Sequence, residues 1–152
     1  MKRKNTDFDR YDLERDDMQN AACFINIDGG FPAHFHSSIE CVYVRSGNIT
    51  AIVDGQVYHA REGQMILTSG YSVHVYMTEE GEHNEVVTLI VPLASIPSLQ
   101  KVLNKKAFKD TIYNVAEDTE LTALFSIIPE HWPEYSPETI KGISYMVLGL
   151  LI

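Results

Sequence analysis

The sequence predicts a mostly β fold: an antiparallel β-barrel followed by two or three C-terminal α-helices. Two observations favour this fold class. Between residues 21 and 93, short runs rich in β-branched and aromatic residues alternate with turn-forming residues, as in an all-β sandwich or barrel. After Pro92, the apolar residues change from a spacing of two toward the spacing of an amphipathic helix. The chain of 152 residues is long enough to bury one sizeable core.

The composition narrows the class of protein. The chain is 45% hydrophobic and 22% charged, as expected for a soluble globular protein. No apolar run reaches the roughly 18 residues that a bilayer span needs, so we expect no membrane partner. The net charge of -9 argues against direct DNA binding, because that function requires a concentrated excess of Lys and Arg.

The N-terminal segment, residues 1–20, is charged and has almost no apolar periodicity. We predict an arm rather than part of the barrel. The segment lacks the apolar centre of a secretory signal, which favours a cytoplasmic location. Cys23 and Cys41 lie in apolar, strand-like runs and not in a CxxC pair, so we expect buried free thiols.

The barrel region is expected to contain seven strands, at residues 22–27, 39–45, 49–54, 56–60, 64–68, 72–78 and 85–93. Ser46-Gly47-Asn48 and Asp54-Gly55 contain residues that tolerate positive φ, which tight hairpins require. Glu62-Gly63 and the polar residues 79–84 provide later connections. The sequence therefore predicts a meander of antiparallel hairpins.

Three helices are expected in residues 94–152. Ser95, Asp118 and Ser136 are the N-cap signals. The first helix is expected at residues 96–104. The second places four apolar residues on one face and is expected to end at Pro129; these residues are Leu121, Leu124, Phe125 and Ile128. The third begins after Ser136 with Pro137 at the first helical position.

The third helix runs to the last residue with an apolar face and without a capping residue. Such a face needs a cover, which the barrel, a second copy of the helix or further sequence would supply. We expect that the natural chain continues beyond Ile152 and that this face takes part in a homodimer. The candidate dimerisation residues are Ile143, Met146, Val147, Leu150 and Leu151.

The most specific chemistry lies between Gly30 and Gly47. Alternate residues of an extended strand point the same way, so His34, His36 and Glu40 share one face if the strand is continuous or carries a paired bulge. His74, on a second expected strand, adds another imidazole. These side chains are ligands that one Zn, Ni, Mn or Fe ion accepts. The alternative is a metal-free polar pocket in which they hydrogen-bond a ligand.

This pattern resembles the first motif of the cupin family, in which HxH, three residues, Glu, six residues and Gly follow one another. His34, His36, Glu40 and Gly47 match it fully. The second motif matches in part. Gly63 and His74 are present, whereas Ser69 stands where Pro is usual, Tyr71 where Gly is usual and Thr78 where Asn often stands. The resemblance implies a cupin or jelly-roll-like barrel.

More narrowly, residues 34–47, Asp54-Gly55-Gln56-Val57-Tyr58, Glu62-Gly63-Gln64 and Ser72-Val73-His74 resemble the sensor domain of AraC-type transcription regulators. The resemblance implies three parts. Residues 21–93 would bind a small-molecule effector, and residues 94–152 would form the linker and dimerisation region. DNA would be bound only by a C-terminal domain that is missing here.

The effector pocket has five aromatic candidates: Phe24, Tyr43, Tyr58, Tyr71 and Tyr76. On this interpretation the protein is not an enzyme. The alternative is a metal-dependent cupin enzyme, an isomerase or a dioxygenase, in which His34, His36, Glu40 and His74 hold the ion.

Overall fold

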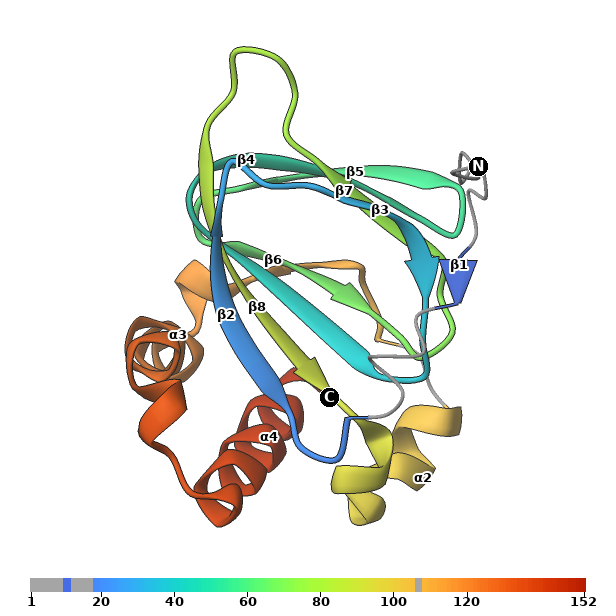
Figure 1. The fold of residues 1–152 in the computed structure, drawn as a ribbon, viewed down its shortest axis with the longest axis vertical. Coiled ribbons are helices and arrows are strands. Elements are labelled where there is room, and N and C mark those ends of the chain that lie inside the picture. Colours follow the sequence, from blue (N-terminus) through green and yellow to red (C-terminus); the bar gives the residue numbers. More distant parts are fainter. Residues whose placement is uncertain (1–9, 12–17, 106–107) are drawn as a thin grey trace, which may run out of the picture.

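The computed structural model describes residues 10–11, 18–105 and 108–152, and places two layers of strands above a group of helices (Figure 1). The predicted arm, residues 1–20, lies mostly outside the described residues. Within the described ranges the strands are Arg10–Tyr11 (β1), Ala22–Ile27 (β2), Phe31–Phe35 (β3), Ile39–Val53 (β4), Gln56–Arg61 (β5), Gln64–Thr68 (β6), His74–Met77 (β7), Asn84–Val91 (β8) and Ile112–Asn114 (β9). The helices are Pro97–Lys105 (α2), Thr119–His131 (α3) and Pro137–Leu151 (α4), with 3-10 turns at Leu93–Ser95 (η1), Val115–Glu117 (η2) and Trp132–Glu134 (η3).

The strands form two sheets that share β4. Sheet A has the order β1-β3-β7-β4-β5 and uses residues 48–53 of β4. Sheet B has the order β2-β8-β4-β6-β9 and uses residues 39–47 of β4. The pairs are antiparallel except for β1 with β3. The mostly β fold class is confirmed, but the predicted meander is wrong, because β8 returns to lie between β2 and β4.

The predicted hairpin at Ser46-Gly47-Asn48 is also wrong. β4 continues through this segment for 15 residues and bends from sheet B into sheet A. The register with β8 shifts between Val44 and Ser46, which is a β-bulge. Gly47 has φ 75°, and a Cβ there would lie 1.8 Å from the carbonyl oxygen of His83. The bulge and the glycine therefore bend the strand without reversing it.

The second predicted hairpin is confirmed. Asp54 and Gly55 have φ values of 48° and 84° and connect β4 to β5. Three strands were not predicted from the sequence: β1, which falls in the predicted arm and pairs with β3, and the strands β3 and β9. β3 was missed because it contains Pro32, and proline is uncommon inside strands. β9 was missed because it has only 3 residues. β9 extends sheet B beside β6 although it belongs to the region predicted to be helical.

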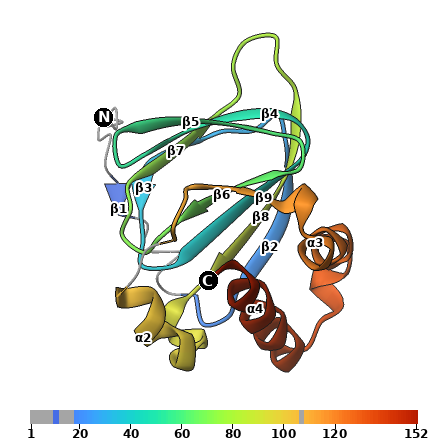
Figure 2. The same cartoon turned by 180° about the vertical axis from the view of Figure 1, so that it is seen from behind.

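Alternate residues of sheet B face two different cores. Inside the barrel, Val42, Val44 and Val86 pack with residues of sheet A such as Ala51 and Tyr76. On the other face, Cys41, Tyr43 and neighbours pack against α3 and α4, and the rings of Tyr43 and Phe125 lie 5.4 Å apart. Helices α2, α3 and α4 all lie on the side of sheet B (Figure 1, Figure 2). One sheet therefore separates the barrel interior from the helices.

The predicted helix boundaries hold in part. Asp118 accepts hydrogen bonds from the amides of Glu120 and Leu121, and Ser136 accepts one from the amide of Thr139. Both are N-caps as predicted. Ser95 is not, because it ends a 3-10 turn and donates its hydroxyl to Pro92.

Pro129 does not end the second helix, which continues to His131. Proline removes one backbone hydrogen bond, but the buried residues Leu121, Phe125 and Ile128 hold the helix against sheet B.

The apolar face of α4 is covered mainly by its own chain. Val147 is fully buried in the core, and Ile143, Leu150 and Leu151 are partly buried against it. Of the five dimerisation candidates, Met146 is the exposed one, at 49%. Val147 therefore has a packing role within the chain. Cys23 and Cys41 are buried free thiols, as predicted. No helix in the described ranges has the length and apolar character needed to cross a membrane.

The bend of β4 yields a stability prediction. We expect Gly47→Ala to lower the free energy of unfolding by at least about 2 kcal/mol, because the new Cβ collides with a backbone oxygen at a positive φ. The matched control is Gly142→Ala in α4, where an added Cβ would have no atom within 4 Å outside its own stretch of helix. This substitution should raise the free energy of unfolding by about 0.5–1 kcal/mol. Urea denaturation measures both. Equal stability of Gly47→Ala and the unmodified chain would contradict the prediction.

Candidate metal centre and cavity

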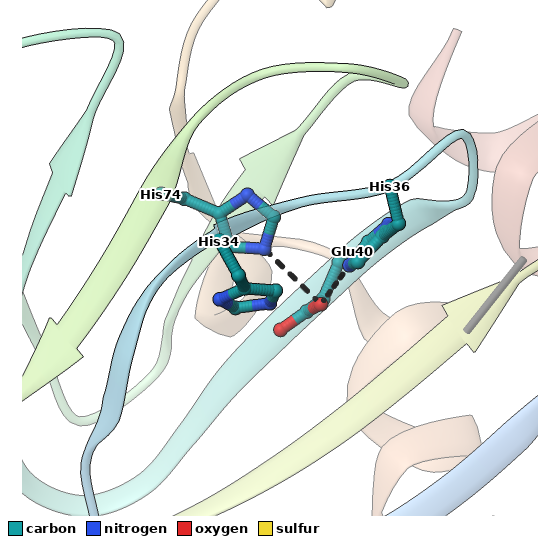
Figure 3. A group of neighbouring side chains, drawn as sticks. All are labelled: His34, His36, Glu40 and His74. Atoms are coloured by element: carbon teal, nitrogen blue, oxygen red, sulfur yellow. Dashed lines mark hydrogen bonds and ion pairs between the residues drawn. The ribbon is translucent and has the colours of Figure 1, made fainter. Parts of the chain in front are cut away.

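Strands β3, β4 and β7 and the β3–β4 connection bring His34, His36, Glu40 and His74 together inside the barrel (Figure 3). His34 and His74 are paired across β3 and β7, and Glu40 lies near the start of β4. The four candidate ligand atoms lie within 4.8 Å of one another. The predicted group therefore forms, but not on one strand: β3 ends at Phe35, so His36 lies in the connection to β4.

Backbone carbonyls orient all three imidazoles. In each ring Nδ1 lies within hydrogen-bond distance of a carbonyl oxygen two residues away: 2.8 Å for His34 and Pro32, 3.1 Å for His36 and Ser38, and 2.8 Å for His74 and Ser72. A carbonyl oxygen only accepts, so Nδ1 carries the proton and donates. In the neutral rings, Nε2 is then the atom with a free lone pair. Metal-binding histidines commonly have this second interaction.

Glu40 is the centre of the group. Its Oε2 lies 3.0 Å from Nε2 of His36 and 3.4 Å from Nε2 of His74. If both rings are neutral with Nδ1 protonated, these pairs place two acceptors against each other. A proton or a metal ion between them removes the repulsion. Nε2 of His74 is buried and has no hydrogen-bond partner among the described residues, which is an arrangement that a metal ion satisfies.

Burial and mutual charge set the protonation of the group. All four residues are at most 4% exposed. Burial alone would raise the pKa of Glu40, but the adjacent His36 and His74 outweigh it and hold this pKa well below its usual range. Burial lowers the pKa of His34 to about 4, and the charge of His74 acts in the same direction. Burial also opposes protonation of His74, but Glu40 prevails and raises that pKa.

At neutral pH the group therefore contains an anionic carboxylate and a neutral His34. This is the donor set that divalent transition metals accept, and the buried Nε2 of His74, which has no hydrogen-bond partner among the described residues, fits such an ion. The residues present are suited to hold one metal ion. It would act there as a Lewis acid or as an anchor for an oxygen ligand.

A cavity of about 230 Å³ reaches this group from the side of the β2–β3 connection. His34 and Glu40 form part of its wall. The other lining residues are Phe24, Asn26, Gly29, Gly30, Phe31, Val42, Ile49, Tyr76, Val86 and Thr88. Asn26 and Thr88 were not predicted, although the alternation of β2 places Asn26 on the same face as Phe24.

Two of the five aromatic candidates, Phe24 and Tyr76, line the cavity. The other three do not. Tyr43 faces the helices, because its neighbours Val42 and Val44 point into the barrel. Tyr58 donates its hydroxyl to Gln56 near the end of the hairpin, and Tyr71 is 65% exposed in a turn with φ 65°. These three side chains therefore do not line this cavity.

Residues 24–91 match the cupin domain family. The matched range includes all four residues of the candidate metal centre, so the motif and the geometry point to the same family of domain. No curated protein matches the chain in a sequence search.

ToxT, a solved structure, shares the fold over most of the chain, and other solved structures are similar over part of it. ToxT from Vibrio cholerae O395 is 14% identical, with a TM-score of 0.56 over 88% of this chain and 57% of ToxT. A mutant form of salicylate 1,2-dioxygenase from Pseudoaminobacter salicylatoxidans is 21% identical, with a TM-score of 0.44 over 55% of this chain and 24% of the enzyme. EutQ from Clostridium difficile is 19% identical, with a TM-score of 0.41 over 48% and 57%. The chain spans less than two thirds of the length of each of these proteins.

The metal centre yields a prediction about pH. We expect the metal-free protein to bind one Co²⁺, with an affinity that falls between about pH 8 and about pH 6, because protons compete for Nε2 of His74, whose pKa is raised. Calorimetry should show that His74→Gln reduces the affinity at least about tenfold and flattens this pH dependence.

His59→Gln is the control, since His59 is exposed on β5, away from the metal centre. An unchanged affinity in His74→Gln would contradict the assignment.

Proposed function

We propose that this chain is the small-molecule-sensing and dimerisation part of an AraC-type transcription regulator. The observation that carries the proposal is a cavity inside the cupin domain whose wall continues, through one sheet, to the helices. The similarity to ToxT extends over 88% of the chain and so includes helical residues as well as the barrel. ToxT is an AraC-family protein, and its crystal structure contains a bound substituted butenoic acid.

Sheet B provides a physical route from the cavity to the helices. Val42, Val86 and Thr88 line the cavity. Their neighbours Tyr43, Val87 and Leu89 point the other way and pack in the core shared with α3 and α4. A ligand that shifts β4 or β8 therefore changes the packing beneath the helices. Such a ligand acts as a signal only if it binds the two resulting arrangements with different affinity.

A divalent metal ion at His34, His36, Glu40 and His74 is part of the proposal. The ion would lie at one end of the cavity, where His34 and Glu40 form the wall. Zn, Ni, Mn and Fe all suit three imidazoles and a carboxylate. The protein's own contribution is to hold Nε2 of each ring toward Glu40 through the carbonyl contacts of Nδ1.

We also propose that two copies pair through α4, with Met146 at the contact. Met146 is 49% exposed on this helix, and Ile127 of α3 and Ile152 at the end of the chain are about as exposed. Sedimentation equilibrium should give the mass of two chains, and Met146→Glu should shift the equilibrium toward one chain. The control is Val57→Glu, at an exposed site on β5. A mass of one chain at all concentrations would contradict the dimer.

The second candidate function is a metal-dependent cupin enzyme, an isomerase or a dioxygenase. The complete set of three histidines and one glutamate favours it, since an ion held in this way can polarise a substrate or activate oxygen. Among the residues that line the cavity, the further titratable group is Tyr76, whose pKa burial raises well above its ordinary value. This leaves no evident general base apart from the ligand set itself.

One experiment separates the two functions. The metal-loaded chain is screened against small sugars, amines and carboxylic acids by thermal denaturation, and each stabilising compound is recovered and identified by mass spectrometry. A sensor should raise the melting temperature and return the compound unchanged. If a stabilising compound is converted to a product, and the conversion requires His74, the sensor proposal is wrong and the protein is an enzyme. Failure of every compound to stabilise the chain would contradict both.

A further inference from the structure

The hydroxyl of Tyr76, like Nε2 of His74, is a buried polar atom without a hydrogen-bond partner among the described residues. Tyr76 lies on β7 two residues after His74, so both side chains point into the barrel. It is 6% exposed and lines the cavity together with His34 and Glu40. Among the described residues, no donor or acceptor forms a hydrogen bond with this hydroxyl.

The neighbours of the hydroxyl are already engaged elsewhere. Glu40 and Thr68 lie close to it without hydrogen-bond geometry. Thr68 donates its hydroxyl to the backbone carbonyl of Glu40, and Oε2 of Glu40 faces His36 and His74. A buried hydroxyl without a partner costs about 1–3 kcal/mol, which phenylalanine at this position would avoid. A ligand in the cavity could supply the missing partner of this hydroxyl.

The charge of the cavity limits what fills it. None of the residues that line it is Lys or Arg, and Glu40 supplies a negative charge. A carboxylate entering the metal-free cavity would be repelled. With a divalent ion bound, the ion and Glu40 together carry one net positive charge, and an anion is attracted instead.

The volume of the cavity and its apolar lining residues further restrict the kinds of ligand that it can hold. A volume of about 230 Å³ is below the roughly 300–1,000 Å³ of pockets for drug-sized ligands. Phe24, Val42, Ile49 and Val86 provide apolar surface away from the ion. A compact apolar body with one anionic end matches this distribution.

We propose that the effector is a small carboxylic acid, that the metal ion provides its positive counter-charge, and that the Tyr76 hydroxyl donates a hydrogen bond to one of its oxygens. This inference rests on the proposed function, because it requires the metal ion in the sensor cavity. Tyr76 thereby selects a ligand with an oxygen acceptor and takes no part in holding the ion itself.

The test uses the Co²⁺-loaded chain with benzoate, acetate and lactate as probes, and benzamide as the neutral match for benzoate. We expect the acids to change the visible absorption of Co²⁺ and benzamide to have no effect. Calorimetry should show that Tyr76→Phe weakens binding of the acids about 5- to 10-fold, the effect of one lost hydrogen bond, while Co²⁺ affinity stays the same.

Tyr58→Phe is the matched control, because the Tyr58 hydroxyl bonds Gln56 outside the cavity. A second readout needs no variant: with ¹³C-labelled tyrosine, the ζ-carbon signal of Tyr76 should shift when benzoate is added to the loaded protein. An unshifted signal, or equal affinities of the unmodified chain and Tyr76→Phe, would overturn the role of Tyr76.

The remaining outcomes separate this inference from the proposed function. If the loaded protein responds to none of the acids but is stabilised by a neutral or cationic compound, the carboxylic acid is wrong and the sensor remains. If benzoate binds the metal-free protein as tightly as the Co²⁺-loaded protein, the metal ion plays no part in recognising the acid. Failure to bind Co²⁺ would overturn both this inference and the metal in the proposed function.

Discussion

The course of β4 determines where the chemically important side chains lie. Its first half belongs to sheet B and carries Glu40, while its second half belongs to sheet A and pairs with β7, which carries His74 and Tyr76. The bend at Gly47 allows one strand to serve both sheets. Because the sheets face each other across the barrel, a carboxylate from one and imidazoles from the other meet in the interior. A straight strand or a reversing hairpin would separate them.

Electrostatics explains why such a group is tolerated in a barrel interior. A lone buried carboxylate is costly, but two imidazoles beside Glu40 favour its charged form strongly enough to outweigh burial. The carbonyl contacts of Nδ1 fix the rings without consuming Nε2. The result is a rigid group with more acceptors than donors at its centre. It is stabilised by a cation, whether protons or a metal ion, and this requirement links the metal to the charge of the cavity.

The sequence predicts the chemistry of the site better than the path of the chain. The spacing of His34, His36, Glu40 and Gly47 is local information, and the structure does bring the histidines and Glu40 together with His74. Gly47 was misassigned to a hairpin, because a positive φ suits a hairpin and a bulge equally and only the distant His83 decides between them. Tyr43 was misplaced for a related reason: its orientation depends on which face of sheet B the helices cover. Both errors concern long-range packing that no local pattern contains.

The two faces of sheet B connect the packing of the barrel interior to the packing of the helices. A single layer of strands separates the cavity, lined by Val42 and Thr88, from the core that contains Tyr43 and Phe125. Protein interiors are packed closely enough that a strand cannot shift on one face alone. A ligand that displaced strands of sheet B would therefore also change the packing of α3 and α4 against that sheet. The buried Val147 of α4 belongs to the same core, so a shift of these strands would reach the helix that carries Met146.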